Sequence, residues 1–320
     1  MRVAGIIVNY RTAELSVQVV NALRAEMKSL APFRIYLVDN ASGDHSIPRF
    51  KEASLKDGWQ SEVEIIEAPR NGGFGYGINQ AVRRALSLPS LPEYFYVLNS
   101  DAFADPGSLT RLVAFLDGHP NAGLAGSHIH GPDGKTQVAC FRFPSLWSEL
   151  EDAAAFGVLT RLLRNHVVSL PLPASDRDVD WISGSSMLIR RSTFEKSGLF
   201  DEGYFLYFEE VDFCRSARMA GFQCYFVADA PITHIGAVST GFTDETRRMP
   251  SYWFDSRSRY FRKHHGVAYA TACDVARILG LLVWHAKERA LGRPAKTRPR
   301  LLRDLLAASW TNLLSVSRRT

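Results

Sequence analysis

The segment from Gly203 to Asp212 holds the side chains with the clearest capacity for chemistry. An aromatic run, Tyr204–Phe208, leads directly into three carboxylates within four residues, namely Glu209, Glu210 and Asp212. Since an aromatic run is expected to pack into a core, the acids that follow it are expected to line a cleft. There a carboxylate can take a proton from a hydroxyl group or accept hydrogen bonds from a substrate. The alternative, a solvated helix start stabilised by the helix dipole, accounts for one of the three acids.

A second polar cluster is rich in glycine and runs Asn71-Gly72-Gly73-Phe74-Gly75-Tyr76-Gly77-Ile78-Asn79, at the start of an expected helix. Glycines allow close approach to the backbone, and the free amides of a helix start favour phosphate. The spacing matches neither the GxGxxG dinucleotide motif nor a phosphate loop ending in Gly-Lys-Ser/Thr. The alternative is a plain glycine turn, which this motif by itself leaves open.

Two further candidates carry possible metal ligands. Asn99-Ser100-Asp101 follows the apolar run Tyr94–Leu98, and a carboxylate at a strand end can hold Mg²⁺ or Mn²⁺ while substrate phosphates supply other ligands. The alternative for an isolated Asp is a capping residue in a turn. His234 sits between apolar residues, and from the residues alone a buried, hydrogen-bonded core histidine is favoured over a ligand.

The elements that must position these residues alternate in type along the first hundred residues. Apolar runs predict parallel strands, and helical periodicity predicts helices between them. The strands are expected at Val3–Asn9, Arg34–Asp39, Glu62–Ala68 and Tyr94–Leu98, and helices at Ala13–Ser29 and Ile78–Leu86. This pattern predicts an α/β fold with a mostly parallel sheet flanked by helices. Ligands of such sheets bind beyond the carboxyl ends of the strands, where Asp39, Asn71–Gly77 and Asn99–Asp101 all fall.

The later part of the chain is less regular. It predicts a helix at Ser108–Gly118, a strand at Trp181–Arg190 and a helix at Glu209–Ala220 that ends at Gly221. On that helix Glu209 and Asp212 share a face, while Glu210 points roughly 100° away, so that one face can bind and another react. The apolar run Ile278–Trp284 is far shorter than the about 20 residues that span a bilayer.

Composition is that of a globular protein, with 46% hydrophobic and 22% charged residues and a net charge of +5. The cysteines form no CxxC pair, which argues against a zinc site or disulfide framework and favours a reducing compartment. Met1–Asn9 resembles a signal-peptide core, but it runs directly into a polar turn. A buried first strand and a cytoplasmic location are therefore expected.

The C-terminal region differs from the rest of the chain in charge. Residues 287–320 carry a net charge of +7, which leaves −2 for residues 1–286. Several apolar side chains there share one helical face, namely Leu302, Leu305, Leu306, Trp310, Leu313 and Leu314. Such a basic amphipathic region is typical of peripheral contact with the inner face of the cell membrane. The alternative is a helix that packs on the protein's own body or on the partner of a homodimer.

Five motifs together resemble family 2 glycosyltransferases, and most closely the bacterial rhamnosyltransferase-like branch. In order they are Val8-Asn9-Tyr10, Val38-Asp39-Asn40-Ala41-Ser42, Asn71–Gly75, Leu98-Asn99-Ser100-Asp101 and Phe208-Glu209-Glu210-Val211-Asp212. The resemblance covers about residues 3–265. It implies a GT-A fold, a nucleotide-diphosphate sugar donor, Mg²⁺ or Mn²⁺ as cofactor, and inversion at the anomeric carbon.

The resemblance also implies roles for individual residues. Asp39 would contact the nucleobase, Asp101 would bind the metal with His234 completing its site, and Asn99 replaces the first acid of the family's DxD motif. Glu210 matches the catalytic base, with Glu209 as the alternative. The remaining donor contacts would come from Asn9, Tyr10, Asn71, Gly72, Gly73, Phe74, Gly77 and Asn79, and acceptor contacts from Trp181, Gly184, Ser185 and Asp212.

By this resemblance we expect an inverting, metal-dependent glycosyltransferase that moves a sugar from a nucleotide-diphosphate donor, dTDP-rhamnose foremost, to a glycan or polyprenyl-linked acceptor in cell-surface polysaccharide synthesis. Nucleic acid is not an expected partner. The expected catalytic domain is 1–265, with a nucleotide-binding half at 1–101 and an acceptor half at 102–265, followed by the helical region 266–320. The alternatives are a sugar nucleotidyltransferase, whose basic glycine-rich loop is not supplied by Asn9–Thr12, and a non-catalytic binding protein.

Overall fold

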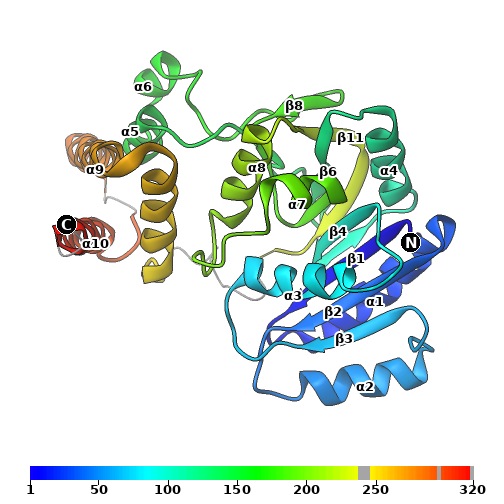
Figure 1. Ribbon diagram of the computed structural model, residues 1–320. Helices are drawn as coiled ribbons and strands as arrows, with labels where there is room; N and C mark the ends of the chain where they lie inside the picture. The colour runs from blue at the N-terminus through cyan, green and yellow to red at the C-terminus, as the bar shows by residue number, and fades with distance from the viewer. Residues whose placement is uncertain (237–245, 294–296, 318–320) are drawn as a thin grey trace. The chain divides into compact units, whose positions relative to one another are not determined.

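The computed structural model describes residues 1–236, 246–293 and 297–317, and the side chains of the last range as far as residue 311. The chain divides into two compact units, and Figure 1 labels most of their helices and strands. The first unit comprises Met1–Phe141, Pro171–Phe205 and Glu209–Thr240. The second comprises Arg142–Leu170, Leu206–Phe208 and Gly241–Thr320.

Four parallel strands open the first unit, as the alternating sequence pattern predicts. They are β1 (Val3–Asn9), β2 (Phe33–Asp39), β3 (Val63–Glu67) and β4 (Tyr94–Asn99), paired in the order β3-β2-β1-β4. Every residue of β1 is buried, which requires a helix on each face of the sheet. Gly5 faces α1 (Ala13–Met27), and Val8, on the opposite face, meets Gly77 of α3 (Phe74–Leu86).

Strands from the second half of the chain extend the same sheet. β10 (Ser186–Arg190) lies antiparallel between β4 and β6 (Ala122–His130), and β11 (Gln223–His234) runs parallel to β6. The short strands β5 (Ala102–Ala104) and β8 (Arg177–Val179) pair antiparallel with β11. Helices complete the unit: η1 (Lys28–Leu30), α2 (Ser46–Lys56), α4 (Ser108–Gly118), α7 (Arg191–Ser197) and α8 (Glu209–Met219). The sheet is therefore mixed and the fold α/β, and strands from both sides of residue 101 belong to the same sheet.

One predicted strand is divided in two. The segment Trp181–Arg190 forms β9 (Trp181–Ile182), which pairs with β7 (Cys140–Phe141) in a separate two-stranded sheet, and then β10 of the main sheet. Between them Ser183 donates its amide to Ala139, and the carbonyl of Ser185 accepts from the amide of Asn99. The prediction of one continuous strand is wrong because the chain changes its partner strands at Gly184.

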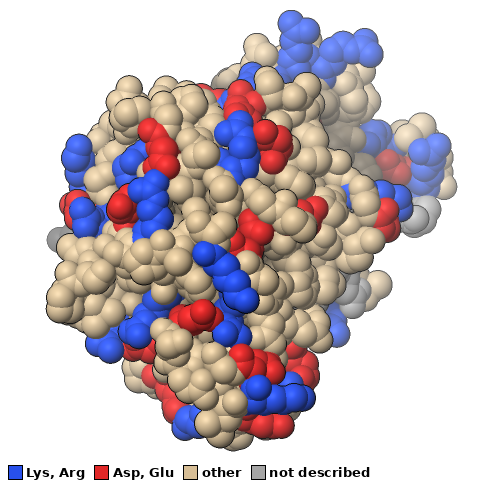
Figure 2. Space-filling model, turned by 90° about the vertical axis from the view of Figure 1, so that its right-hand side faces the viewer, with Lys and Arg blue, Asp and Glu red and all other residues tan. Residues whose placement is uncertain are grey.

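Charges on the first unit are largely balanced locally. On the face shown in Figure 2, basic and acidic side chains are interspersed. Ion pairs in this unit include Arg24–Glu62 at 2.7 Å and Arg111–Asp176 at 2.6 Å. Exposed pairs of this kind contribute little to stability, at most about 1 kcal/mol each. The excess of positive charge in the sequence therefore belongs to the C-terminal residues.

The second unit consists of helices α5 (Leu146–Ala154), α6 (Gly157–Leu162), α9 (Ser251–Ala290) and α10 (Leu301–Ser317). Gly266, with φ 82° and ψ 172°, interrupts α9. Buried Arg257, before the break, pairs with Glu149 of α5 at 2.9 Å and with Asp274, after the break, at 2.5 Å. Because these ion pairs join both halves of α9 to α5, the compact unit does not begin at residue 266, and the predicted boundary there is wrong.

Helix α9 is one described helix that is long and apolar enough to cross a membrane, and 28% of its most apolar stretch is buried. The apolar run Ile278–Trp284 thus belongs to a longer helix than the sequence predicts. The apolar face predicted for α10 is only partly buried. Leu305 is buried in a core with Met249 and Phe254, whereas Trp310 is 65% exposed. Leu313 and Leu314 lie outside the described side chains.

Candidate active site

Asp101 and His234 meet at one end of the main sheet. Asp101 follows β4, and His234 is the last residue of β11, where it pairs with Ala102 of β5. His234 Nε2 lies 3.3 Å from Asp101 Oδ1, and the amide of Ile235 donates to the carbonyl of Asp101. The side chain of Asn99 lies 3.5 Å from the same ring nitrogen. The structure thus brings together the two predicted metal ligands, which lie far apart in sequence.

This pair fits a divalent cation of the Mg²⁺ or Mn²⁺ class only if the cation takes further ligands from a substrate. The Asp101 carboxylate is a ligand type that suits either cation. Among the described residues no group of three or more His, Cys, Asp or Glu side chains could hold a metal. Gln137, which the sequence did not single out, donates to the carbonyl of His234 at 3.1 Å and fixes the backbone there.

The glycine loop packs against the segment that carries the acids. Gly73 has φ 93°, and a Cβ atom on it would lie 1.8 Å from the carbonyl oxygen of Phe205. That carbonyl accepts from the amide of Phe74 at 3.1 Å, and the amide of Gly73 donates to Asn71 Oδ1. Two amides at this helix start are therefore engaged within the protein, contrary to the predicted free amides. Gly72 and Gly77 likewise give room to Tyr76 and Val8.

Asp39 is held in a buried hydrogen-bond network at the end of β2. Its carboxylate accepts from Asn9 Nδ2 at 2.8 Å and from the hydroxyl and amide of Ser42. The other end of the fully buried Asn9 amide accepts from Thr12 and Ser16 of the following segment. Asn9 therefore positions Asp39. Tyr10 is half-buried beside it.

Arg11 and Ser42 complete this corner, and the sequence analysis missed their roles. The guanidinium of Arg11 donates to the carbonyl of Ser42 and lies 5.2 Å from the centre of the Tyr10 ring. Ser42 stands within the motif Val38–Ser42, and that position was the signal available in the sequence.

Glu209 and Glu210 are the first residues of α8 and face different neighbours. The Cβ of Glu209 lies 3.6 Å from the position a Cβ on Gly75 would take, and that of Glu210 lies 3.8 Å from the equivalent point on Gly184. The ring of Phe74 also borders Gly184. The structure therefore brings Glu209 next to the glycine loop, and Glu210 next to the predicted acceptor residue Gly184.

Burial raises the pKa of both carboxyls. The pKa of Glu210 rises to about 7, and that of Glu209 rises well above its usual value, also because of the neighbouring Glu210 charge. One oxygen of each carboxyl is buried without a hydrogen-bond partner among the described residues. A carboxylate whose pKa lies near neutral pH is suited to general base catalysis. Glu209 is buried, whereas Glu210 is only partly so, which favours Glu210 as the group that a substrate reaches.

The other side chains predicted to contact the substrate differ in their exposure to solvent. Trp181 stacks on Phe141, with ring centroids 3.9 Å apart, and both rings are partly exposed. Ser185 is buried and its hydroxyl lies 3.0 Å from that of Ser183. Asp212 is buried and accepts from the hydroxyl of Tyr204 at 3.1 Å. Contacts of these three side chains with a substrate stay predictions.

Asn79 is fully buried and serves the fold. Its amide nitrogen donates to the carbonyl of Phe200 and to Glu202, and its oxygen accepts from the amide of Phe200. These bonds hold the segment before the acids against α3. Its side-chain amide is engaged within the protein, and the contact of Asn79 with a sugar-nucleotide donor stays a prediction.

One α/β unit thus carries the Asp101–His234 pair at a strand end and two acids of α8 beside the glycine loop. Its fold is GT-A-like. The family model described as glycosyl transferase family 2 matches residues 6–158. An N-acetylglucosaminyl-diphospho-decaprenol L-rhamnosyltransferase of Mycobacterium tuberculosis is 30% identical over 221 residues, which are 66% of this chain and 69% of that protein. The chain belongs to glycosyl transferase family 2 and is rhamnosyltransferase-like.

Further relatives agree with this assignment. Rhamnosyltransferase WbbL of Escherichia coli is 45% identical over 160 residues, covering 48% of this chain and 58% of that protein. A mannosyltransferase of Pyrobaculum calidifontis, solved with GDP-Man and Mn²⁺, has a TM-score of 0.60 at 16% identity and covers 98% of this chain and 87% of its own. TarS of S. aureus, solved with UDP-GlcNAc, has a TM-score of 0.55 at 14% identity, covering 91% and 75%. For the two solved structures, at 16% and 14% identity, the likeness shows the fold alone.

Proposed function

We propose that the protein is an inverting glycosyltransferase that moves rhamnose from dTDP-rhamnose to a lipid-linked glycan acceptor, with a divalent cation as cofactor. The observation that carries the proposal is the Glu210 carboxyl, whose pKa is raised to about 7 beside Gly184 and the ring of Phe74. The rhamnosyl group and the lipid-linked acceptor are supported by the names of the relatives from Mycobacterium tuberculosis and Escherichia coli.

In the proposed reaction Glu210 accepts the proton of an acceptor hydroxyl as its oxygen attacks the anomeric carbon. The bond from that carbon to the diphosphate oxygen breaks, and the nucleotide diphosphate leaves from the opposite side. A cation held by Asp101, His234 and diphosphate oxygens would supply positive charge beside the leaving group. Asp39, which Asn9 and Ser42 hold in place, would orient the nucleobase.

A transfer assay tests the proposal directly. The purified protein is incubated with an N-acetylglucosaminyl-diphospho-polyprenol and, in turn, dTDP-rhamnose, UDP-GlcNAc and GDP-mannose, with and without Mn²⁺. We expect product only with dTDP-rhamnose and metal, with the anomeric configuration inverted in the NMR spectrum of the product. Transfer from another donor would refute the donor assignment, and retention of configuration would refute the mechanism.

The second unit is the proposed membrane contact. Val275, Leu279, Leu282 and Val283 are 40–51% exposed and share one face of α9 after Gly266. Exposed basic side chains follow on the same unit, namely Arg289, Arg293, Arg300 and Arg303. Apolar and basic side chains together suit a bilayer surface with anionic lipids, to which each basic residue contributes on the order of 1 kcal/mol.

Vesicle sedimentation separates this contact from the alternatives. We expect the protein to pellet with anionic but not neutral vesicles, more so at low salt. Leu279→Ser combined with Val283→Ser should weaken pelleting, while the matched exposed pair Leu55→Ser and Met219→Ser in the first unit should not. Vesicle-independent self-association in ultracentrifugation, lost in the Leu279 and Val283 variant, would favour a homodimer interface instead.

A further inference from the structure

The chain passes through the second unit for three residues immediately before the catalytic helix. Leu206–Phe208 belong to the second unit, whereas Phe205 and Glu209 on either side belong to the first. Glu209 is the first residue of α8, so the conformation of these three residues sets the point from which the helix starts.

The segment is anchored at its first end by the glycine loop. The carbonyl of Phe205 accepts from the amide of Phe74, and the glycine at position 73 is required by this close approach. The ring of Phe74 in turn lies beside Gly184, next to the Cβ of Glu210. The position of Phe205 is therefore fixed by residues that surround the carboxylate.

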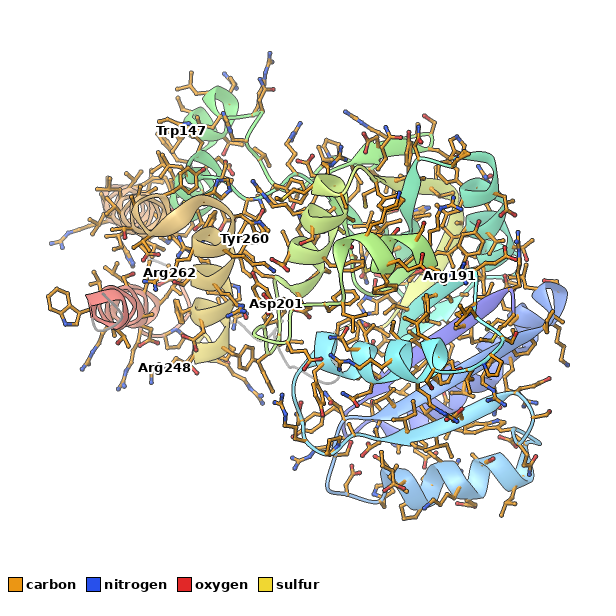
Figure 3. The ribbon with its side chains drawn as sticks, in the orientation of Figure 1. Trp147, Arg191, Asp201, Arg248, Tyr260 and Arg262 are labelled. Carbon is orange, nitrogen blue, oxygen red and sulfur yellow. The ribbon has the colours of Figure 1, made fainter. Side chains whose placement is uncertain are left out.

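Residues from the first part of α9 contact the rest of the segment Leu206–Phe208. Ser256 donates its hydroxyl to the carbonyl of Leu206 at 3.0 Å. The ring of Tyr207 lies 6.1 Å from that of Tyr252, with an angle of 27° between the ring planes. The ring of Phe208 lies 6.3 Å from Trp253 and 5.6 Å from Tyr260, which projects from α9 in Figure 3. All four partners come from the part of α9 before Gly266.

These contacts hold the backbone of Tyr207 and Phe208 in an unfavourable conformation. Tyr207 and Phe208 have φ of 67° and 69°, in the left-handed region that residues with a Cβ rarely occupy. Two such residues in succession persist only where the surroundings over-determine them, and they occur preferentially at functional sites. They reverse the chain so that Glu209 and Glu210 open the helix.

We propose that Phe208 is a positioning residue for Glu210: its ring, held by Trp253 and Tyr260, keeps the left-handed turn closed and so aims the carboxylate. Tyr207 and Ser256 support the same turn. This inference rests on the proposed role of Glu210 as the base.

The test compares Phe208→Ala with Phe208→Tyr and with Leu170→Ala. Leu170 is buried in the same unit, in the segment Arg142–Leu170. For Phe208→Ala we expect kcat to fall about 10-fold to 100-fold with little change in the KM of the donor, since about 1 Å of misplacement can cost that much. The pKa in its pH–rate profile should move from about 7 toward the ordinary carboxylate value. Phe208→Tyr should retain kcat, and Leu170→Ala should lower Tm but keep kcat and the pH profile.

A double variant separates this inference from the proposed function. If Phe208 acts through Glu210, Phe208→Ala should cause no further loss of kcat in a Glu210→Gln background. Equal losses of kcat in both backgrounds, or a Phe208→Ala protein with normal kcat and pH profile, would overturn the positioning role alone. A Glu210→Gln protein with normal turnover would instead overturn the proposed base.

Discussion

At the start of α8, burial removes two adjacent glutamates from bulk water, but only Glu210 remains partly accessible. Glu210→Gln keeps the shape of the side chain and removes the proposed proton acceptor. We expect turnover to fall by roughly 100-fold or more while donor binding changes little. Steady-state kinetics with a calorimetric titration of the donor measures both quantities. If Glu209→Gln is the inactive variant and Glu210→Gln turns over normally, the assignment is reversed.

The raised pKa of Glu210 also predicts how rate and stability depend on pH. Because the base must be deprotonated, kcat/KM should rise with pH and reach half its maximum near pH 7, not near the usual 4.5. The folded protein holds this proton more tightly than the unfolded chain does. The stability from this group is therefore full below about pH 4.5 and is lost as pH rises to about 7. In Glu210→Gln both dependences should weaken; a profile unchanged in that variant would contradict the prediction.

Asp101 and His234 provide the third prediction at this scale. Asp101→Ala removes a proposed metal ligand, so we expect the binding of a nucleotide diphosphate to lose its enhancement by Mn²⁺, and His234→Ala to reduce it. Calorimetry with and without Mn²⁺ measures the difference. His45→Ala, a change at an exposed histidine, is the matched control and should leave the enhancement intact. Equal enhancement in the wild-type protein and in Asp101→Ala would rule out this metal site.

At the scale of the elements, the close packing of Gly73 in the glycine loop against Phe205 can be tested by substitution. Gly73→Ala places a methyl group 1.8 Å from the carbonyl oxygen of Phe205 at φ 93°. Gly107→Ala, at φ 83° with open space around it, isolates the backbone effect. We expect about 1–2 kcal/mol of destabilisation for Gly107→Ala and at least about 3 kcal/mol for Gly73→Ala, measured by urea unfolding. Equal losses would mean that the contact with Phe205 adjusts without cost.

The elements also show where sequence patterns suffice. Strands β1 and β4 were predictable because both faces are buried, so that their residues form continuous apolar runs. Strand β6, which carries two glycines and two histidines, shows no such run, although its residues pair with β10 and β11. The residues of the candidate site were likewise predictable where they follow a strand with a continuous apolar run. Asp101 was predictable from its strand end, but its distance from His234 depends on β11, a strand that local periodicity does not reveal.

Other parts of the site depend on contacts between distant segments. Asn79 resembles a ligand-binding residue in its motif, yet Phe200 and Glu202 use all its hydrogen-bonding groups. The left-handed conformation of Phe208 is equally absent from the sequence pattern, since a phenylalanine ordinarily avoids it. Packing against Trp253 and Tyr260 decides the conformation there, and local propensity is overridden.

At the scale of the molecule, the ion pairs across Gly266 predict the effect of shortening the chain. A protein ending at residue 265 would keep buried Arg257 and Glu149 but lose Asp274 and Arg277. Because the truncation removes the second half of α9 and leaves Arg257 with one of its two carboxylate partners, we expect the second unit to unfold. Circular dichroism and limited proteolysis of the shortened chain measure this. A chain ending at residue 293 retains all four charges and is the control; if both chains melt alike, the ion pairs are dispensable.

The excursion of Leu206–Phe208 into the second unit has a consequence for biosynthesis. The partners of these residues, Tyr252 to Tyr260, leave the ribosome well after Glu210 does, at about 5–20 residues per second. The main sheet can form earlier, since β11 ends at His234. A nascent chain would therefore hold a formed sheet and a mispositioned acid for some seconds. Transfer of sugar would begin only after Tyr260 has left the ribosome, and the cell's pool of activated sugar would be spared until then.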